Sequence, residues 1–284
     1  MTQSVEDNQA ICLATLRETD RDRYLACLLS PPGERGALAA LYAFAAELAR
    51  VRDTVREPLP GEVRLQWWRD LLEGNARGAS EANPVAAGLL SAIETHHLPR
   101  QTLLNMIEAR VSDLYDDPIG NRGALEGYAG ETASALIQLA SLVLDPENAA
   151  ASAEAAGHAG VAQAIAGLLL LMPLHRHRGQ LYLPLDILSA TGLDRDSFLA
   201  GEDKVRISAA IEIFAGLGRD HLQKARDAGK ISPVAFPAFL PVALAGPVLT
   251  LARKSGANLF DHPLQPPQWR RQWWMAKANF TKRF

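Results

Sequence analysis

The residues best suited to chemistry lie on a predicted helix over residues 33–56. Apolar residues there recur at three- and four-residue spacing, which is typical of a helix with one buried face. Steps of four residues place Tyr42 and Asp53 along a neighbouring stripe, together with Ala46 and either Ala49 or Arg50. Asp53 is the only acid from Ala49 onward in that stripe, so the segment offers one carboxylate where a metal site needs several.

A second chemically interesting stretch runs from residue 159 to residue 184. It begins as an apolar helix that we expect to be buried on all sides, and Pro173 should kink it or start its end. His175 and His177 follow, interleaved with arginines. On a helix these two imidazoles point about 200° apart, and in an extended turn, where they could converge, no third ligand is visible. A basic loop or a lid over a cavity is favoured over a zinc site.

Two further groups have simpler interpretations. Asp113, Asp116 and Asp117 cluster before Pro118, where a solvated helix end is favoured over a metal site. Cys12 and Cys27 have neither CxxC spacing nor the pattern of a disulfide framework, which indicates reduced thiols.

The segment 266–284 predicts a basic, aromatic C-terminal helix. Its candidate contact residues for a membrane or a partner are Trp269, Arg270, Arg271, Trp273, Trp274 and Lys277. An anionic bilayer or a protein partner fits this composition. The alternative is that the tryptophans dock the helix on the body of the protein. A net charge of −3 and a pI near 6.2 argue against nucleic acid.

The chain as a whole predicts an all-α fold, because no period-2 pattern of any length occurs. Residues 1–284 are interpreted as one domain, since no repeat or low-complexity linker divides them. Helices are expected at 6–18, 20–30, 33–56, 61–75, 83–96, 100–116, 122–144, 147–175, 205–228, 231–255 and 266–280, with short turns between 182 and 201.

The sequence also bears on location. The N-terminal residues are acidic and no apolar signal region follows them, which favours a cytoplasmic protein. The most apolar stretches, 159–174 and 235–252, are short or interrupted by proline, so an integral membrane protein is not expected. Peripheral contact with a membrane surface stays open.

Two motifs carry a family resemblance. ALYAF followed by Asp53 resembles the first signature of the squalene/phytoene synthase family, and Gly-x-x-Tyr-Leu-Pro at 179–184 resembles the second. The resemblance implies an isoprenoid-synthase helical bundle around a central cavity. It also implies enzymes that join two prenyl diphosphates head to head, with Mg²⁺ held by carboxylates from both signatures.

Some positions match the family's functional residues. The resemblance places Tyr42 near the reacting carbons, Asp53 at the end of the first acidic cluster and Tyr182 in the second signature. Gln163 lies within one position of a family glutamine, and Arg21 is a candidate for a diphosphate-binding arginine. These residues are candidates to line a ligand cavity, together with Ala49, Arg50, Leu171 and His175.

The family's metal-binding acids are missing. Ala49 and Arg50 replace two of them in the first signature, and Leu171, Leu174 and His175 stand at the acidic positions of the second. Diphosphate departure leaves negative charge that metal ions must neutralise. We therefore expect no metal, no cofactor and no catalysis by the family's route.

The strings ELARVRD, LQWW, AQAIAG, MPLH and VAFPAFL are similar to one branch of this family, the respiratory complex I assembly factors. That branch implies an assembly factor whose partner is a complex I membrane-arm subunit or an assembly intermediate. The acidic N-terminus without a presequence favours a bacterial member, at the inner membrane. Two alternatives stay open: an active Mg²⁺-dependent prenyl-diphosphate transferase, and a carrier of an isoprenoid or quinone.

Overall fold

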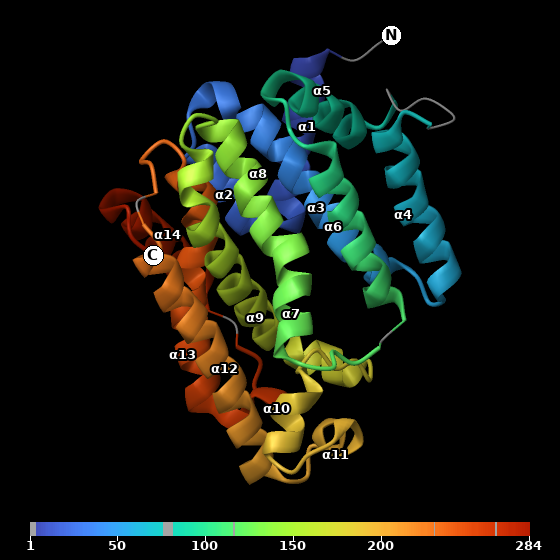
Figure 1. Cartoon of the computed structure of the whole chain (residues 1–284), viewed down its shortest axis with the longest axis vertical. Helices are drawn as coiled ribbons and strands as arrows, with labels where there is room; N and C mark the ends of the chain where they lie inside the picture. Colours follow the sequence, from blue (N-terminus) through green and yellow to red (C-terminus); the bar gives the residue numbers. More distant parts are fainter. Residues whose placement is uncertain (1–3, 76–81, 116, 230, 265) are drawn as a thin grey trace. The chain divides into compact units, whose positions relative to one another are not determined.

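The computed structural model describes residues 4–75, 82–115, 117–229, 231–264 and 266–284, and every regular element in these ranges is helical (Figure 1). The all-α prediction is confirmed. The chain divides into two compact units, one formed by residues 1–115, 135–153 and 230–238 and the other by residues 116–134, 154–229 and 239–284.

The first unit contains the helix with the first signature. Its elements are α1 (Val5–Thr19), α2 (Arg21–Leu28), η1 (Pro32–Glu34), α3 (Arg35–Thr54), α4 (Pro58–Glu73), α5 (Pro84–His96), α6 (Arg100–Val111), η3 (Ser112–Leu114), α8 (Ala135–Leu144) and η5 (Ala149–Ser152).

Helix α3 is the centre of the first unit, because α1, α4, α5 and α8 all pack against it (Figure 1). Small side chains make this close packing possible. A Cβ at Gly88 of α5 would lie 3.1 Å from the Cβ of Ala40 on α3 and 3.4 Å from Cys12 Sγ on α1. Glycine at this position therefore lets α5 approach both neighbours.

The second unit contains the second signature and the C-terminal helix. Its elements are α7 (Arg122–Ala129), the π-turn η4 (Gly130–Ser134), α9 (Ala153–His177), α10 (Leu185–Ala190), α11 (Arg195–Ala200), α12 (Lys204–Asp227), α13 (Ala245–Ser255), η7 (Gly256–Phe260) and α14 (Gln268–Thr281). The segment η6 (Phe236–Leu244) begins in the first unit and continues into the second from residue 239.

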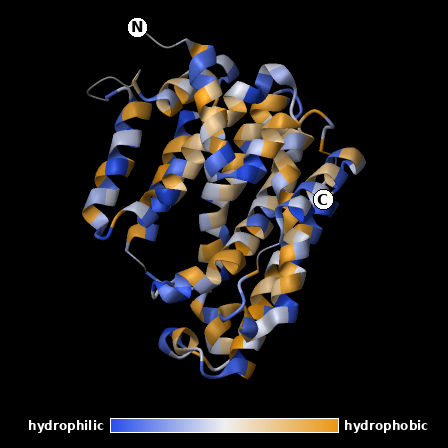
Figure 2. Cartoon of the chain, turned by 180° about the vertical axis from the view of Figure 1, so that it is seen from behind, coloured by the Kyte–Doolittle hydropathy of each residue, from blue (hydrophilic) through white to orange (hydrophobic). Residues whose placement is uncertain are grey.

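Helix α12 packs between α9 and α13 through Gly218. A Cβ there would lie 2.7 Å from Leu249 of α13 and 3.0 Å from Ile165 of α9. Single helices carry both hydrophobic and hydrophilic residues (Figure 2), as expected for helices with one buried and one exposed face.

Four predicted helices differ clearly from the structure. The α-helix expected over 100–116 ends at Val111, and the one expected over 147–175 begins at Ala153. The helix expected over 231–255 begins as a 3₁₀ segment, Phe236–Leu244, and becomes α-helical only at Ala245. The helix expected over 122–144 is interrupted by η4. Pro173 does not end α9, which continues to His177.

Two segments, 149–177 and 236–260, are long and apolar enough to cross a membrane by length and composition alone. The protein buries 56% of the most apolar part of the first segment and 67% of that of the second, as is usual for core helices.

Candidate functional site

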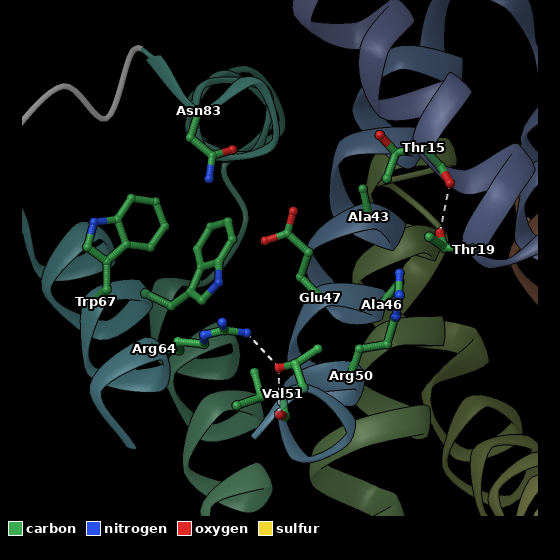
Figure 3. Close-up of a pocket in the computed structure, with 12 residues that line it drawn as sticks. Thr15, Thr19, Ala43, Ala46, Glu47, Arg50, Val51, Arg64, Trp67 and Asn83 are labelled. Carbon is green, nitrogen blue, oxygen red and sulfur yellow. Dashed lines mark hydrogen bonds between the residues drawn. The ribbon is translucent and has the colours of Figure 1, made fainter. Parts of the chain in front are cut away.

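A pocket of about 480 Å³ opens in the first unit beside α3 (Figure 3). Its walls come from α1, α3 and α4 and from the residue that precedes α5. The lining residues are Thr15, Thr19, Ala43, Ala46, Glu47, Arg50, Val51, Thr54, Arg64, Trp67, Trp68 and Asn83.

Aromatic packing fixes one wall of this pocket. Phe44 is fully buried on α3, and its ring meets the edge of Trp68 at a centroid distance of 4.9 Å. Trp67 packs edge-on against Trp68, also at 4.9 Å. The contact between Phe44 and Trp68 holds α4 against α3, and both indoles line the pocket.

Most polar groups around the pocket are already engaged. Thr15 and Thr19 donate their hydroxyls to backbone carbonyls of α1, at 2.9 and 2.8 Å. Arg64 Nη1 donates to Thr54 Oγ1 at 2.6 Å. Asn83 Oδ1 accepts from the amide of Val85 at 2.9 Å and so caps α5.

Glu47 is the ionisable group most affected by this setting. Its carboxylate points into the pocket in Figure 3. Burial raises the pKa of Glu47, and the positive charge of Arg50, one turn away, lowers it in part. A half-buried acid beside an arginine and two indoles can recognise a ligand or side chain with an apolar body and a polar end.

The residues predicted from the first signature lie in different settings. Tyr42 is buried, with the Arg23 guanidinium 5.8 Å from its ring centroid, and burial raises the pKa of its phenol. Arg21, Ala49 and Asp53 are exposed. Of the predicted cavity-lining residues, Arg50 lines the pocket of Figure 3.

The second signature lies at the end of α9. The His175 ring packs on Tyr182 at a centroid distance of 4.5 Å, and both border a cavity of about 10 Å³. Such a cavity holds at most one water molecule. Gln163 is half-buried farther back on α9.

The acidic positions of the second signature carry exposed aliphatic groups. Leu171 is 48% and Leu174 is 40% exposed on α9. Neither can coordinate a cation, and Mg²⁺ prefers oxygen ligands. Within the described part of the chain, no three His, Cys, Asp or Glu side chains are grouped so that they could hold a metal ion. The residues at the signature positions do not fit Mg²⁺.

Other candidate groups are accounted for by packing. Burial raises the pKa of Cys12 and of Cys27 to about 12, so both remain protonated thiols. Asp113 pairs with Arg110 at 3.0 Å. Asp116, predicted as part of the same acidic group, lies outside the described residues, and Asp117 is exposed.

The C-terminal candidates divide between two settings. Trp269, Arg270 and Trp273 are exposed on α14. Trp274 and Lys277 line a second pocket, of about 620 Å³, and Arg271 is half-buried. The exposed pair, Trp269 and Trp273, therefore does not dock the helix on the body of the protein.

The chain belongs to the squalene/phytoene synthase family, whose family model matches residues 16–273. It is 34% identical over 255 residues to "NADH dehydrogenase (ubiquinone) complex I, assembly factor 6" of Homo sapiens, covering 89% of this chain and 76% of the relative. It is 23% identical over 277 residues to the 15-cis-phytoene synthase of Synechocystis, covering 93% and 82%.

Solved structures agree on the fold. A dehydrosqualene synthase in complex with a ligand superposes with a TM-score of 0.81 at 18% identity, covering 98% of this chain and 97% of that one. The predicted isoprenoid-synthase helical fold is confirmed.

Sequence reasoning missed much of the pocket lining. Thr15, Arg64 and Asn83 come from three separated segments that only tertiary packing brings together. The sequence around Glu47 does contain a signal that could have identified this residue as a candidate site residue. It is an acid between Phe44 and Leu48 on a helix with eleven buried residues, where a charge is costly to bury.

Proposed function

We propose that the chain is a non-catalytic member of its family that supports assembly of the NADH–quinone oxidoreductase, complex I. This proposal rests on the loss of the metal-binding acids. Their positions are occupied by Ala49 and Arg50 on α3 and by Leu171, Leu174 and His175 on α9. The similarity to complex I assembly factor 6 supports the same conclusion.

Synthases of this family must neutralise a departing diphosphate with metal ions, and the ions need oxygen ligands. Loss of one electrostatic stabiliser costs an enzyme roughly 10²–10³ in rate. Replacement of most ligands by aliphatic and basic groups removes the site rather than weakening it.

In this proposal the protein works in the bacterial cytoplasm at the inner membrane. Its partner is a membrane-arm subunit of complex I or an assembly intermediate that contains one. No metal or cofactor takes part.

Gene deletion tests the function. We expect deletion to lower the amount of assembled complex I and NADH-linked respiration, while succinate-linked respiration serves as the internal control. Unchanged complex I after deletion would contradict an assembly role.

Complementation separates assembly from hidden catalysis. The deletion strain receives the wild-type gene or the variant Asp53→Asn, which removes the last acid of the first signature from an exposed position. An assembly factor should tolerate this change, so complex I returns to the wild-type level. A loss equal to that of the deletion would instead indicate carboxylate chemistry at Asp53.

A second candidate function is the carriage of an isoprenoid or quinone tail without chemical change. It is favoured by Leu171 and Leu174, which are aliphatic and exposed at the acidic positions of the family. Mass spectrometry of lipids extracted from the purified protein tests it. A stoichiometric isoprenoid in the wild type, reduced in the variant Leu171→Asp/Leu174→Asp, would support carriage, and its absence from the wild type would count against it.

A further inference from the structure

The outward face of α14 exposes three large aromatic side chains. Trp269 is 64% exposed, Trp273 is 63% and Phe280 is 91%. Isolated exposed apolar residues are ordinary, but an apolar group on one short helix marks an interaction surface.

The three rings form one stripe. They are separated by steps of four and seven residues, which on an α-helix fall within about 40° of one another. We call these residues, Trp269, Trp273 and Phe280, the aromatic stripe. It follows the helix for most of its length.

The packing of α14 does not use the aromatic stripe. Met275 and Ala278 are the buried residues of this helix, and they lie on the opposite side. Beyond the helix, the Phe284 ring stacks on Phe239 at a centroid distance of 6.0 Å, and Arg226 Nε donates to the backbone oxygen of Phe284 at 2.7 Å. These contacts hold the segment in place and leave the stripe available.

Positive charge borders the aromatic stripe. Arg270 and Lys277 are seven residues apart and flank it on one side, about 60° to 80° from its centre. The Arg270 guanidinium lies 5.3 Å from the centroid of the Trp269 ring. The sequence contains no acid after Asp261, so nothing within α14 offsets these charges.

A pocket adjoins the basic flank. It measures about 620 Å³, and its lining includes Lys277, Thr281 and Arg283 together with Trp274 and Phe284. Two cations and a hydroxyl beside aromatic rings offer partners for an anionic group of phosphate size.

We propose that α14 docks on an anionic phospholipid surface. The aromatic stripe enters the headgroup–acyl boundary, while Arg270, Lys277 and Arg283 contact lipid phosphates. A helix with a narrow aromatic face and a basic flank is the arrangement that lies in the plane of a bilayer. This inference deepens the proposed function, because it says how an assembly factor reaches a membrane complex.

Charge complementarity favours a bilayer over a protein groove. A groove would have to supply acids along one flank and a slot for three aromatic rings. A bilayer offers phosphates to the cations and an interfacial region that indoles favour, and it does so anywhere on its surface.

Co-sedimentation of the purified full-length chain with lipid vesicles tests the proposal and does not depend on complex I. The vesicles contain phosphatidylcholine alone or phosphatidylcholine with phosphatidylglycerol, at low salt and at about 0.5 M salt. We expect binding to the anionic vesicles that weakens at high salt, and little binding to the neutral ones.

A charge pair provides the matched control. Arg270→Glu/Lys277→Glu and Arg253→Glu/Lys254→Glu reverse the same number of exposed cations, the second pair on α13. We expect the α14 variant to lose binding by on the order of ten-fold or more, and the α13 variant to bind within about two-fold of wild type.

A second pair tests the aromatic stripe. Trp269→Ala/Trp273→Ala should weaken binding by on the order of ten-fold, whereas Val205→Ala, at an exposed position of α12, should not. Circular dichroism confirms that each variant remains folded.

Three outcomes overturn the proposal. One is absence of wild-type binding to anionic vesicles, and another is equal loss in the α13 and α14 charge variants. The third is an aromatic-stripe variant that binds vesicles normally yet lowers complex I in the cell, which would assign α14 to a protein partner. If vesicle binding follows α14 but deletion leaves complex I unchanged, the surface stands and the assembly function falls.

Discussion

Helix α3 buries its aromatic residues, whereas helix α14 exposes three of its four. Tyr42 and Phe44 on α3 are enclosed by neighbouring helices, while Trp269, Trp273 and Phe280 on α14 face outward. The two helices also differ in charge. On α3 an arginine occupies a position where the family places a metal-binding acid, and on α14 cations border an apolar stripe.

This difference indicates where the protein acts. The retained Tyr42 packs inside the protein, whereas the positions of the missing acids, such as Ala49 and Leu171, are exposed and carry groups that cannot bind a metal; Asp53 is the one acid retained. On the surface, α14 offers apolar area that its own packing does not use. An assembly factor needs a surface more than a catalytic interior, so the comparison favours interaction over catalysis.

The largest expected effect comes from the α3 side of the comparison. Phe44→Ala removes a fully buried ring that packs on Trp68. We expect a loss of about 3–5 kcal/mol in the free energy of unfolding, from lost burial and the cavity left behind. Urea denaturation measures it. A loss below about 1 kcal/mol would show that α3 is not the centre of its unit.

A smaller loss is expected where α9 approaches the π-turn. A Cβ at Gly160 would lie 2.3 Å from the backbone nitrogen of Ser134, so Gly160→Ala should cost about 1–3 kcal/mol. Gly157→Ala is the matched control in the same helix, because no atom lies within 4 Å of its Cβ. It should be neutral or stabilising by up to about 1 kcal/mol. Equal effects of the two changes would contradict the close approach.

A pair formed by the half-buried His158 and the buried His221 should make stability depend on pH. His158 Nδ1 lies 3.1 Å from His221 Nδ1, and His221 Nε2 lies 3.2 Å from Glu126 Oε1. Burial, and then the charge of His221 and of Lys224, lower the pKa of His158. Glu154 and Glu126 act in the opposite direction.

The folded protein binds a proton at His158 less readily than the unfolded chain does. The contribution of His158 to the free energy of unfolding is therefore fully present above the ordinary histidine pKa of about 6.5. It decreases as the pH falls below that value. Thermal unfolding between pH 8 and pH 5 measures the effect, and His158→Gln should flatten the profile. Parallel profiles for the wild type and the variant would exclude His158 as the source.

The smallest effect is expected on α14. Trp273→Ala removes an exposed ring, so the free energy of unfolding should change by no more than about 0.5 kcal/mol. The same denaturation experiment as for Phe44→Ala measures it. A loss comparable to that of Phe44→Ala would mean that the aromatic stripe holds the fold together, and the contrast between the two helices would disappear.

Much of the fold followed from the sequence because it depends on local periodicity. Helices α3, α12 and α14 match their predicted ranges within two residues at each end. The exposure of Trp269 and Trp273 could not be predicted, because the same spacing suits a ring packed on the body and a ring facing outward.

The irregular segments were missed for physical reasons. Pro237 and Pro241 lack amide donors, and the backbone from Phe236 to Leu244 adopts 3₁₀ geometry that residue propensities do not distinguish from an α-helix. The π-turn at Gly130–Ser134 is accompanied by tertiary bonding, since Ser134 Oγ donates to the Gly157 carbonyl of α9 at 2.7 Å. Such a contact is absent from any local pattern.

The candidate site shows the same division. The replacement of the family's acids could be predicted from the sequence residue by residue, because a motif fixes each position. The pocket beside α3 could not be predicted, since Thr15, Glu47 and Asn83 converge only when α1, α3 and the start of α5 pack together (Figure 3).

We propose that this synthase fold does not bind a magnesium–diphosphate pair. Isothermal titration calorimetry of the purified chain with farnesyl diphosphate, in the presence of Mg²⁺ or of a chelator, tests it most directly. We predict the same negligible heat in both conditions. Tight binding of farnesyl diphosphate that requires Mg²⁺ would show that the fold still holds this pair.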